Sequence, residues 1–297
     1  MPWLQLSFAL PEARLATAEA VLEAAGAQAI TLQDGADQPL FEPGPGETPL
    51  WRALRLQALL APDTDTEALR AALTRALDGE PAGWRLEALP ERAWERAWMD
   101  DFRPMRFGER LWICPSWAEP PAPEAVNLRL DPGLAFGTGT HPSTRLCLEW
   151  LDAHPPRDQE VIDYGCGSGV LGLAALALGA RHVTGVDIEP QALEASRANA
   201  RANGFDDARL TLCTPEALAD RPADLLLANI LAGPLIDLAP RLARLVRPGG
   251  TLVLAGILAE QADAVARAYQ PWFNIGPPRH HEEWVRLTGR RHRGPAA

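Results

Sequence analysis

A short glycine-rich segment constrains the fold of this chain more than any other feature. An apolar run ends at Asp163, and glycines then alternate with small residues at positions 165, 167 and 169. This order predicts a strand, a tight turn and a helix, because glycine accepts positive φ angles and lets a ligand approach the main chain. The dinucleotide-binding fingerprint requires another glycine three residues after Gly167, where this chain has Val170. The spacing argues against a dinucleotide site, and a purely structural turn is the alternative.

An acidic residue at the end of the next predicted strand is the second signal. The strand spans residues 182–186, and Asp187 follows it, 20 residues after Gly167. Ligands of open α/β sheets bind at the carboxyl ends of the strands, where a carboxylate can accept hydrogen bonds from both hydroxyls of a ribose. A polar strand end without a ligand is the alternative, but the two features together favour nucleoside binding. Dehydrogenases share such an acid, so the glycine spacing, and not Asp187, separates the two kinds of cofactor.

The hydrophobic pattern predicts an α/β chain with two domains. Residues 1–90 show the order βαββαβ, which is the ferredoxin-like pattern. Residues 91–123 are expected to form a helical linker and a proline-rich connector. Residues 124–297 alternate strands and helices in the manner of a doubly wound parallel sheet.

Three local expectations follow from the same pattern. Aromatic residues recur every fourth residue over 91–102 and predict one face of a linker helix. A single helix is expected over 234–245. Two last strands, near 273–275 and 284–287, are expected to pair as a hairpin at the edge of the large sheet.

The composition excludes several classes of protein. No apolar run of about 18 residues occurs, so no membrane contact is expected. The first residues lack the basic and apolar segments of a secretory signal, which predicts a cytoplasmic protein. The cysteines are scattered without a Cys-x-x-Cys pair, so neither a metal site nor a disulfide framework is indicated; they are Cys114, Cys147, Cys166 and Cys213.

The charge of the chain is uneven. Residues 1–101 carry 17 acidic residues and eight arginines, a net charge of −9, whereas residues 102–297 carry 22 and 20, a net charge of −2. An acidic amino-terminal part favours a basic partner and repels phosphate backbones. Direct binding of nucleic acid is therefore not expected, although plain solubility also explains the acidity.

The glycine segment, in the form Asp-x-Gly-x-Gly-x-Gly, resembles the first motif of class I S-adenosylmethionine-dependent methyltransferases. Asn229 stands after the fourth predicted strand, where amino-group methyltransferases carry Asn/Asp-Pro-Pro-aromatic and use the side-chain oxygen to hold the substrate amine. Residues 230–232 replace the Pro-Pro-aromatic part with Ile-Leu-Ala, so an aliphatic amine fits better than a planar base. Capping of the next helix by Asn229 is the alternative.

Residues 130–144 form a loop that is rich in glycine and hydroxyl groups. A predicted helix follows over 145–151, so Ser143 and Thr144 lie near a helix amino terminus, where free N–H groups attract an anion such as the carboxylate of a methionyl group. Capping alone is the alternative. His141 is a candidate base, but a lone histidine beside a proline is more often structural.

The resemblance to one family covers nearly the whole chain. Residues 98–117, 130–144, 163–169 and 229–235, with the opening Met-Pro-Trp, resemble the ribosomal protein L11 methyltransferase family. The family implies an enzyme that uses S-adenosyl-L-methionine to methylate lysine ε-amino and amino-terminal α-amino groups, up to the trimethyl state. It also implies an amino-terminal domain that grips a large-subunit ribosomal protein.

The same resemblance assigns site residues. The family's cofactor contacts correspond here to Thr144, Gly165, Asp187 and Asn229, and Gly167 joins them from the same turn. Asn229 is also the expected catalytic residue, and no metal is expected. An RNA or small-molecule methyltransferase, a nicotinamide-dependent oxidoreductase and a binding protein without activity are the alternatives.

Overall fold

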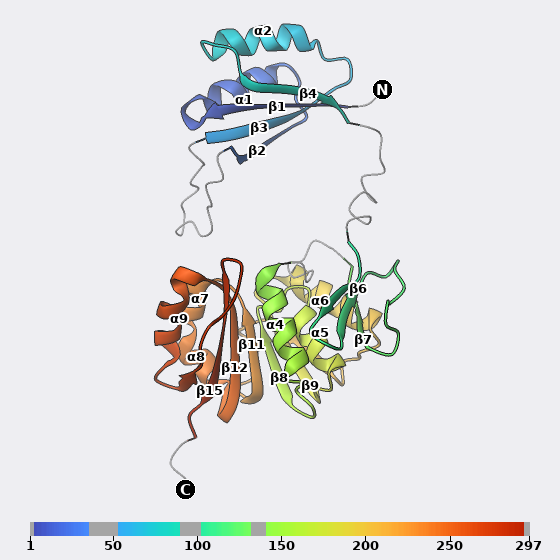
Figure 1. Ribbon diagram of the computed structural model, residues 1–297, viewed down its shortest axis with the longest axis vertical. Coiled ribbons are helices and arrows are strands. Elements are labelled where there is room, and N and C mark those ends of the chain that lie inside the picture. Colours follow the sequence, from blue (N-terminus) through green and yellow to red (C-terminus); the bar gives the residue numbers. More distant parts are fainter. Residues whose placement is uncertain (1–2, 36–52, 90–101, 132–140, 294–297) are drawn as a thin grey trace. The chain divides into compact units, whose positions relative to one another are not determined.

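The computed structural model describes residues 3–35, 53–89, 102–131 and 141–293, which belong to two compact units, Met1–Asp100 and Asp101–Ala297 (Figure 1). The linker helix predicted over 91–102 lies outside the described residues except for Phe102. No helix in the described parts of the chain is long and apolar enough to cross a membrane.

The first unit is one antiparallel sheet in the order β2-β3-β1-β4, with two helices on one face (Figure 1). This is the strand order of a ferredoxin-like fold. Apolar residues alternate along the central strands, so one face packs against the helices. The elements are β1 Leu4–Pro11, α1 Leu15–Ala24, β2 Ala29–Asp34, β3 Ala53–Leu60, α2 Thr66–Ala76 and β4 Ala82–Ala88.

The opposite face of this sheet is polar. Gln57 accepts a hydrogen bond from Gln5 and donates one to Gln33, both at 3.0 Å, so a row of amides crosses three strands. Water or a polar partner can satisfy the remaining groups of such a row, whereas an apolar cover would leave them unpaired.

The second unit is built on a large sheet in the order β10-β9-β8-β11-β12-β15-β13. The first five strands in this order are parallel, and β15 runs antiparallel to β12, β13 and β14. Both predicted last strands are present, but the predicted pairing of 273–275 with 284–287 is wrong: β13 pairs with residues 289–291, and residues 284–286 pair with β14. This topology confirms the predicted doubly wound α/β class. The strands are β8 Glu160–Tyr164, β9 His182–Val186, β10 Leu210–Cys213, β11 Ala223–Asn229, β12 Val246–Leu258, β13 Phe273–Ile275, β14 Arg279–His281 and β15 Trp284–Arg291.

The order of these strands reverses at β8. The chain proceeds from β8 to β9 and β10 on one side and then to β11 and β12 on the other. In such sheets the crevice at the carboxyl ends of the strands on either side of the reversal is the ligand site.

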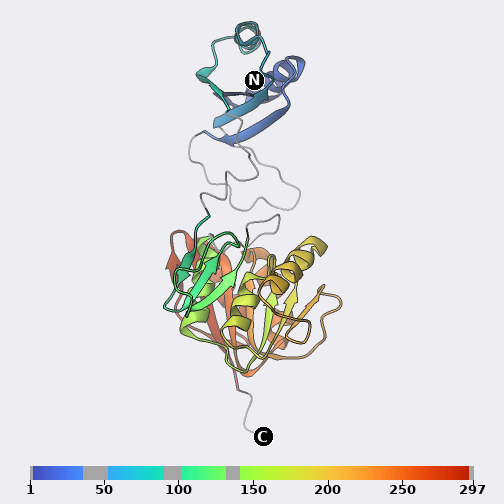
Figure 2. The same ribbon diagram turned by 90° about the vertical axis from the view of Figure 1, so that its right-hand side faces the viewer.

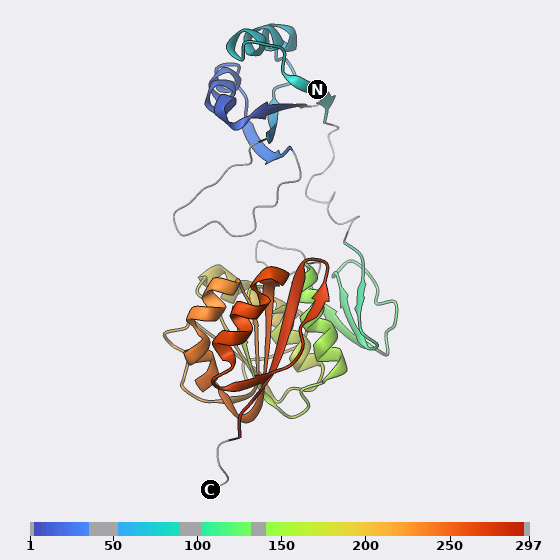
Figure 3. The same ribbon diagram turned by 60° about the vertical axis from the view of Figure 1, so that its left-hand side comes forward.

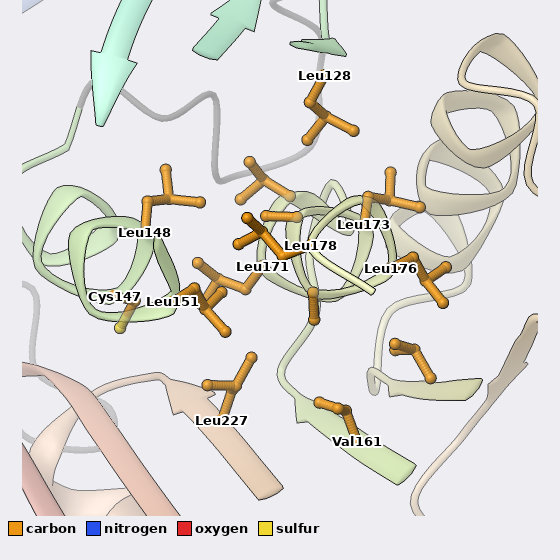
Figure 4. Packing of buried hydrophobic residues seen from close by; sticks show 14 of the residues in the cluster. Leu128, Cys147, Leu148, Leu151, Val161, Leu171, Leu173, Leu176, Leu178 and Leu227 are labelled. Atoms are coloured by element: carbon orange, nitrogen blue, oxygen red, sulfur yellow. The ribbon is translucent and has the colours of Figure 1, made fainter. Parts of the chain in front are cut away.

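Helices cover both faces of the large sheet, with α4 to α6 on one and α7 to α9 on the other (Figures 1 and 3). Figure 4 shows Leu148 and Leu151 of α4 against Leu171 of α5, with Val161 and Leu227 of the sheet beneath them. The helices are α4 Pro142–Ala153, α5 Val170–Ala177, α6 Pro190–Ala202, α7 Ala232–Asp237, α8 Ala239–Arg244 and α9 Ala262–Tyr269.

The single helix predicted over 234–245 is wrong, because the chain breaks there into α7 and α8. Pro240 has no N–H to donate to the carbonyl of Ile236, and its ring would collide with that carbonyl in a continuous helix.

A small sheet of β5 Met105–Phe107, β6 Leu111–Cys114 and β7 Val126–Arg129 packs on α4 and α5 (Figure 2). Asp152 of α4 is 3% exposed and accepts hydrogen bonds from the N–H groups of Glu109, Arg110 and Leu111 at 2.7, 3.1 and 3.1 Å. The described part of the predicted connector therefore belongs to the core of the second unit.

Candidate functional site

The glycine-rich turn joins β8 to α5 through three residues with positive φ. Gly165, Gly167 and Gly169 have φ angles of 76°, 55° and 81°. The N–H groups of Gly165 and Cys166 both donate to the carbonyl of Val186, at 2.7 and 3.0 Å. The turn is thus fixed to the end of β9, and a side chain at any of the three glycines would be strained.

Asp187 follows β9 and holds the same turn. Its Oδ2 accepts a hydrogen bond from the N–H of Gly167 at 2.8 Å, and its Oδ1 accepts one from the N–H of Glu189 at 3.0 Å. A carboxylate has about four acceptor positions. Asp187 therefore retains capacity for two further donors, such as a pair of hydroxyl groups.

Two side chains of α6 fasten the turn from the other side. Ser196 donates to the carbonyl of Gly167 at 2.8 Å, and Asn199 donates to the carbonyl of Ser168 at 2.9 Å. The sequence analysis missed both residues. Their spacing of three along a helix, which places them on one face, is the signal that could have found them.

Asn229 ends β11 and contacts α4. Its Nδ2 donates to Oγ1 of Thr144 at 3.1 Å, and Thr144 is 1% exposed. Because Nδ2 is engaged, Oδ1 is the atom left to accept a hydrogen bond from a bound molecule. The capping alternative gains no support, since Leu231 and not Asn229 is the N-cap of α7.

His141 caps α4, which begins at Pro142, three residues earlier than predicted. Its Nδ1 accepts from the N–H of Ser143 at 3.3 Å and lies 2.7 Å from the Ser143 hydroxyl. Burial lowers the pKa of His141, although Glu283 and Glu282 act in the opposite direction. A neutral ring suits this capping role, which is a structural role of the kind that was the alternative to catalysis for His141.

One pocket of about 610 Å³ brings all five predicted site residues together: Thr144, Gly165, Gly167, Asp187 and Asn229. The sequence analysis did not single out several other residues of its lining, which surround the same crevice; they are Tyr164, Ile188, Pro215, Glu216 and Arg241. Ile188, at 72% exposure, and Leu231, at 49%, leave apolar surface at its mouth. The general rule that strand ends carry the site could have found Ile188 and Glu216.

Asp163 lies beneath the turn and is 1% exposed. Its Oδ2 accepts from the N–H of Gly172 at 2.8 Å, while Oδ1 is buried with no hydrogen-bond partner among the described residues. Burial raises the pKa of Asp163 to about 7, the Gly172 hydrogen bond opposes this rise, and Asp187 adds to it.

We expect Asp163→Asn to flatten the pH dependence of stability. The pKa of an aspartate in an unfolded chain is about 4, so between that value and about 7 only the folded protein keeps the proton. The contribution of Asp163 to the free energy of unfolding should therefore be fully present below about pH 4 and be lost as the pH rises through this window. Asparagine keeps the acceptor for Gly172 but does not ionise. Thermal unfolding from about pH 4 to 8 tests this, with the exposed Asp207→Asn as control, and an equal slope for Asp163→Asn and the wild type contradicts it.

Comparisons with known proteins extend the likeness beyond this pocket. The family described as ribosomal protein L11 methyltransferase (PrmA) matches residues 2–292. Relatives named ribosomal protein L11 methyltransferase are 55% identical over 298 residues in Marinobacter nauticus, covering 99% of this chain and 100% of the relative, and 54% identical over 291 residues in Pseudomonas aeruginosa, covering 98% and 99%.

A solved structure agrees with these sequences. The crystal structure of ribosomal protein L11 methylase from Lactobacillus delbrueckii subsp. bulgaricus has a TM-score of 0.59 and 32% identity, and the match covers 64% of this chain and all of that one. The sequence similarity includes both units of this chain, whereas a doubly wound sheet alone is shared by many unrelated enzymes.

Proposed function

The chain belongs to the ribosomal protein L11 methyltransferase family, and from this premise we propose that it transfers methyl groups from S-adenosyl-L-methionine to amino groups of ribosomal protein L11. Family membership disfavours a nicotinamide-dependent oxidoreductase and a binding protein without activity. Lysine ε-amino and amino-terminal α-amino groups are the proposed targets, as the family resemblance implies.

One observation carries the proposal: three candidate groups stand side by side at one edge of the sheet. Tyr164 of β8 is in register with Val186 of β9 and with Ala228 of β11. The residues that follow these three are Gly165, Asp187 and Asn229, so turn, acid and amide are neighbours in one pocket. A nucleoside at the acid and a reactive carbon near the amide would span the point where the strand order reverses.

The residues present fit this cofactor. A volume of about 610 Å³ lies within the range of pockets for molecules of this size. Asp187 has acceptor capacity for two ribose hydroxyls, and the turn at Gly165 and Gly167 exposes main chain without side chains. The exposed side chain of Ile188 next to Asp187 supplies an apolar surface for a planar base.

When bound, S-adenosyl-L-methionine supplies a methyl group on a positively charged sulfur, so that attack by a neutral amine forms the new C–N bond as the C–S bond breaks. The chain's own contribution is alignment, because such a donor is already activated. Oδ1 of Asn229 would accept a hydrogen bond from the amine and direct its lone pair, while Thr144 holds the amide in that orientation.

The amine must be neutral to react, and a lysine side chain has a pKa near 10.4. Among the described residues that line the pocket there is no histidine, and we assign the proton to no particular side chain. The apolar side chains of Ile230 and Leu231 favour the neutral amine by excluding water. They also suit an aliphatic stem better than a planar base.

Transfer of labelled methyl groups to a fractionated ribosomal extract tests the proposed function. We expect the label in the protein fraction, on a single large-subunit protein, with no label when the cofactor is omitted. Label found only in RNA or in small molecules would overturn the proposal in favour of the corresponding alternative.

We further propose that the first unit selects the substrate, because it has its own core, a polar open sheet face and most of the net acidic charge. A shortened chain of residues 101–297 is expected to bind the cofactor as the full chain does but to lose most methylation of the ribosomal protein. Calorimetry and the labelling assay, run on both chains, measure the two effects. Full activity of the shortened chain would show that recognition lies elsewhere.

A further inference from the structure

Strand β12 contains a bulge at the level of the proposed catalytic amide. Leu254 pairs with Leu287 and Ile257 pairs with Val285, so two residues of β12 oppose the single residue Arg286 of β15. The second of the two, Gly256, has a φ of +79°. Glycine accepts this left-handed conformation without strain, and bulges are frequent beside active sites, where they redirect neighbouring groups.

The bulge lies directly against the residue after Asn229. Asn229 is in register with Ala255, so Ile230 and Gly256 are the next residues on the two strands. A Cβ atom on Gly256 would overlap the carbonyl oxygen of Ile230 and lie 2.9 Å from its carbonyl carbon and 3.1 Å from its nitrogen. The main chains of the two residues are therefore closer than any side chain at position 256 allows.

A second glycine confines the same residue from the other side. A Cβ atom on Gly165, in the glycine-rich turn, would overlap Cγ2 of Ile230. Ile230 is thus held between Gly256, which contacts its main chain, and Gly165, which contacts its side chain. Ile230 therefore cannot shift toward either glycine if a side chain replaces the hydrogen there.

The bulge is also connected to Thr144, the residue that orients the Asn229 amide. Arg286, opposite the bulge, donates from one terminal nitrogen to the carbonyl of Leu146 in α4 at 2.9 Å. Thr144 lies two residues earlier in the same helix. The bulge region therefore contacts both the end of the strand that carries Asn229, through Gly256, and the helix that carries Thr144, through Arg286.

We propose that Gly256 is a positioning residue for methyl transfer. Its bulge fixes the position of the Asn229–Ile230 peptide in the pocket, and this position determines the alignment of the substrate amine. The inference rests on the proposed function and adds to it a residue that touches neither the cofactor pocket nor the reacting atoms. Gly256 is buried, and its neighbours Ala255 and Ile257 are fully buried. The surrounding main chain therefore has little space to move away from a side chain at position 256.

The test compares Gly256→Ala with Gly249→Ala in the full-length protein. Gly249 lies in the same strand with a φ of +75°, but a Cβ atom there would meet only Arg293, at 3.4 Å from its Nε. Both variants strain a left-handed residue, so both should lower the melting temperature. Only Gly256→Ala is expected to slow single-turnover transfer at saturating cofactor, by about tenfold, since displacements below about 1 Å at a reacting centre have effects of up to about 100-fold.

Two readouts separate positioning from mere loss of structure. Cofactor affinity of Gly256→Ala, measured by calorimetry at a temperature where the variant is folded, should stay near the wild-type value. The share of trimethylated product should fall in favour of monomethylated product. A wild-type rate in Gly256→Ala, or an equal loss of rate in Gly249→Ala, overturns the inference.

Ile230→Ala serves if Gly256→Ala does not fold. It removes the side chain that fills the space beside Gly165, so that only the contact with Gly256 still confines the main chain of Ile230. The rate should again fall more than the cofactor affinity, and an unchanged rate overturns the inference. The wild type, assayed in parallel, keeps the two proposals apart: absence of transfer by the wild type is a failure of the proposed function, whereas wild-type rates in these variants are a failure of this inference alone.

Discussion

Replacing Asp187 with alanine is expected to weaken binding of S-adenosyl-L-methionine by roughly 10- to 150-fold, which corresponds to about 1.5–3 kcal/mol for lost hydrogen bonds to a charged group. The carboxylate has two tasks here. It would accept the ribose hydroxyls, and it already accepts the N–H groups of Gly167 and Glu189 at 2.8 and 3.0 Å. Calorimetric titration with the cofactor measures the effect.

A matched control is available two residues away. Glu189 also lines the pocket and is exposed, so Glu189→Gln removes one negative charge without removing the acceptor of the turn. We expect its effect on affinity to be small, since exposed charges interact weakly. Equal losses for the two variants would mean that general electrostatic attraction, and not a bond to ribose, explains the role of Asp187. If Asp187→Ala binds the cofactor with unchanged affinity, Asp187 does not bind the ribose hydroxyls.

The large elements of the site could be predicted because each follows an apolar run that ends in a polar or glycine residue. Carboxyl ends of parallel strands meet at one edge of a sheet, so Gly165, Asp187 and Asn229 were expected at the same edge once three parallel strands were predicted. That they are neighbours follows from the observed strand order. Thr144 could be proposed as a ligand-binding residue from its place at a helix amino terminus, but its contact with Asn229 could not be predicted, since it spans 85 residues of sequence.

The parts that could not be predicted depend on register and on contacts between distant segments. The bulge at Gly256 exists because β12 has one residue more than β15 between two pairs of partners, and no local pattern reveals that difference. Asp152 binds N–H groups that lie 41 to 43 residues earlier, so the attachment of the small sheet was equally hidden. The helix break at Pro240 is different, because the proline itself was a visible signal.

Asn229→Ala is expected to lower the rate of methyl transfer about 100- to 1000-fold at saturating cofactor, the magnitude seen when one well-placed hydrogen-bonding group is removed from a reacting centre. Cofactor affinity should fall much less, because the amide contacts the amine in the proposed arrangement and Asp187 with the turn holds the nucleoside. The contact between Asn229 Nδ2 and Thr144 Oγ1, at 3.1 Å, fixes which amide atom faces the substrate. Single-turnover transfer measured across cofactor concentrations separates rate from affinity.

Thr144→Val tests whether the orientation of the Asn229 amide matters, because this variant keeps the amide but removes the hydrogen bond that orients it. Valine has nearly the shape of threonine but cannot accept the hydrogen bond from Nδ2, so the amide of Asn229 is free to rotate and to present a donor where the amine needs an acceptor. An intermediate loss of rate, smaller than that of Asn229→Ala, is expected if orientation matters. Asn229→Asp keeps a side-chain oxygen at the same place and should retain more activity than the alanine variant. If Asn229→Ala transfers methyl groups at the wild-type rate, the amine is aligned by other groups of the pocket, and the peptide that Gly256 supports has no part in the chemistry.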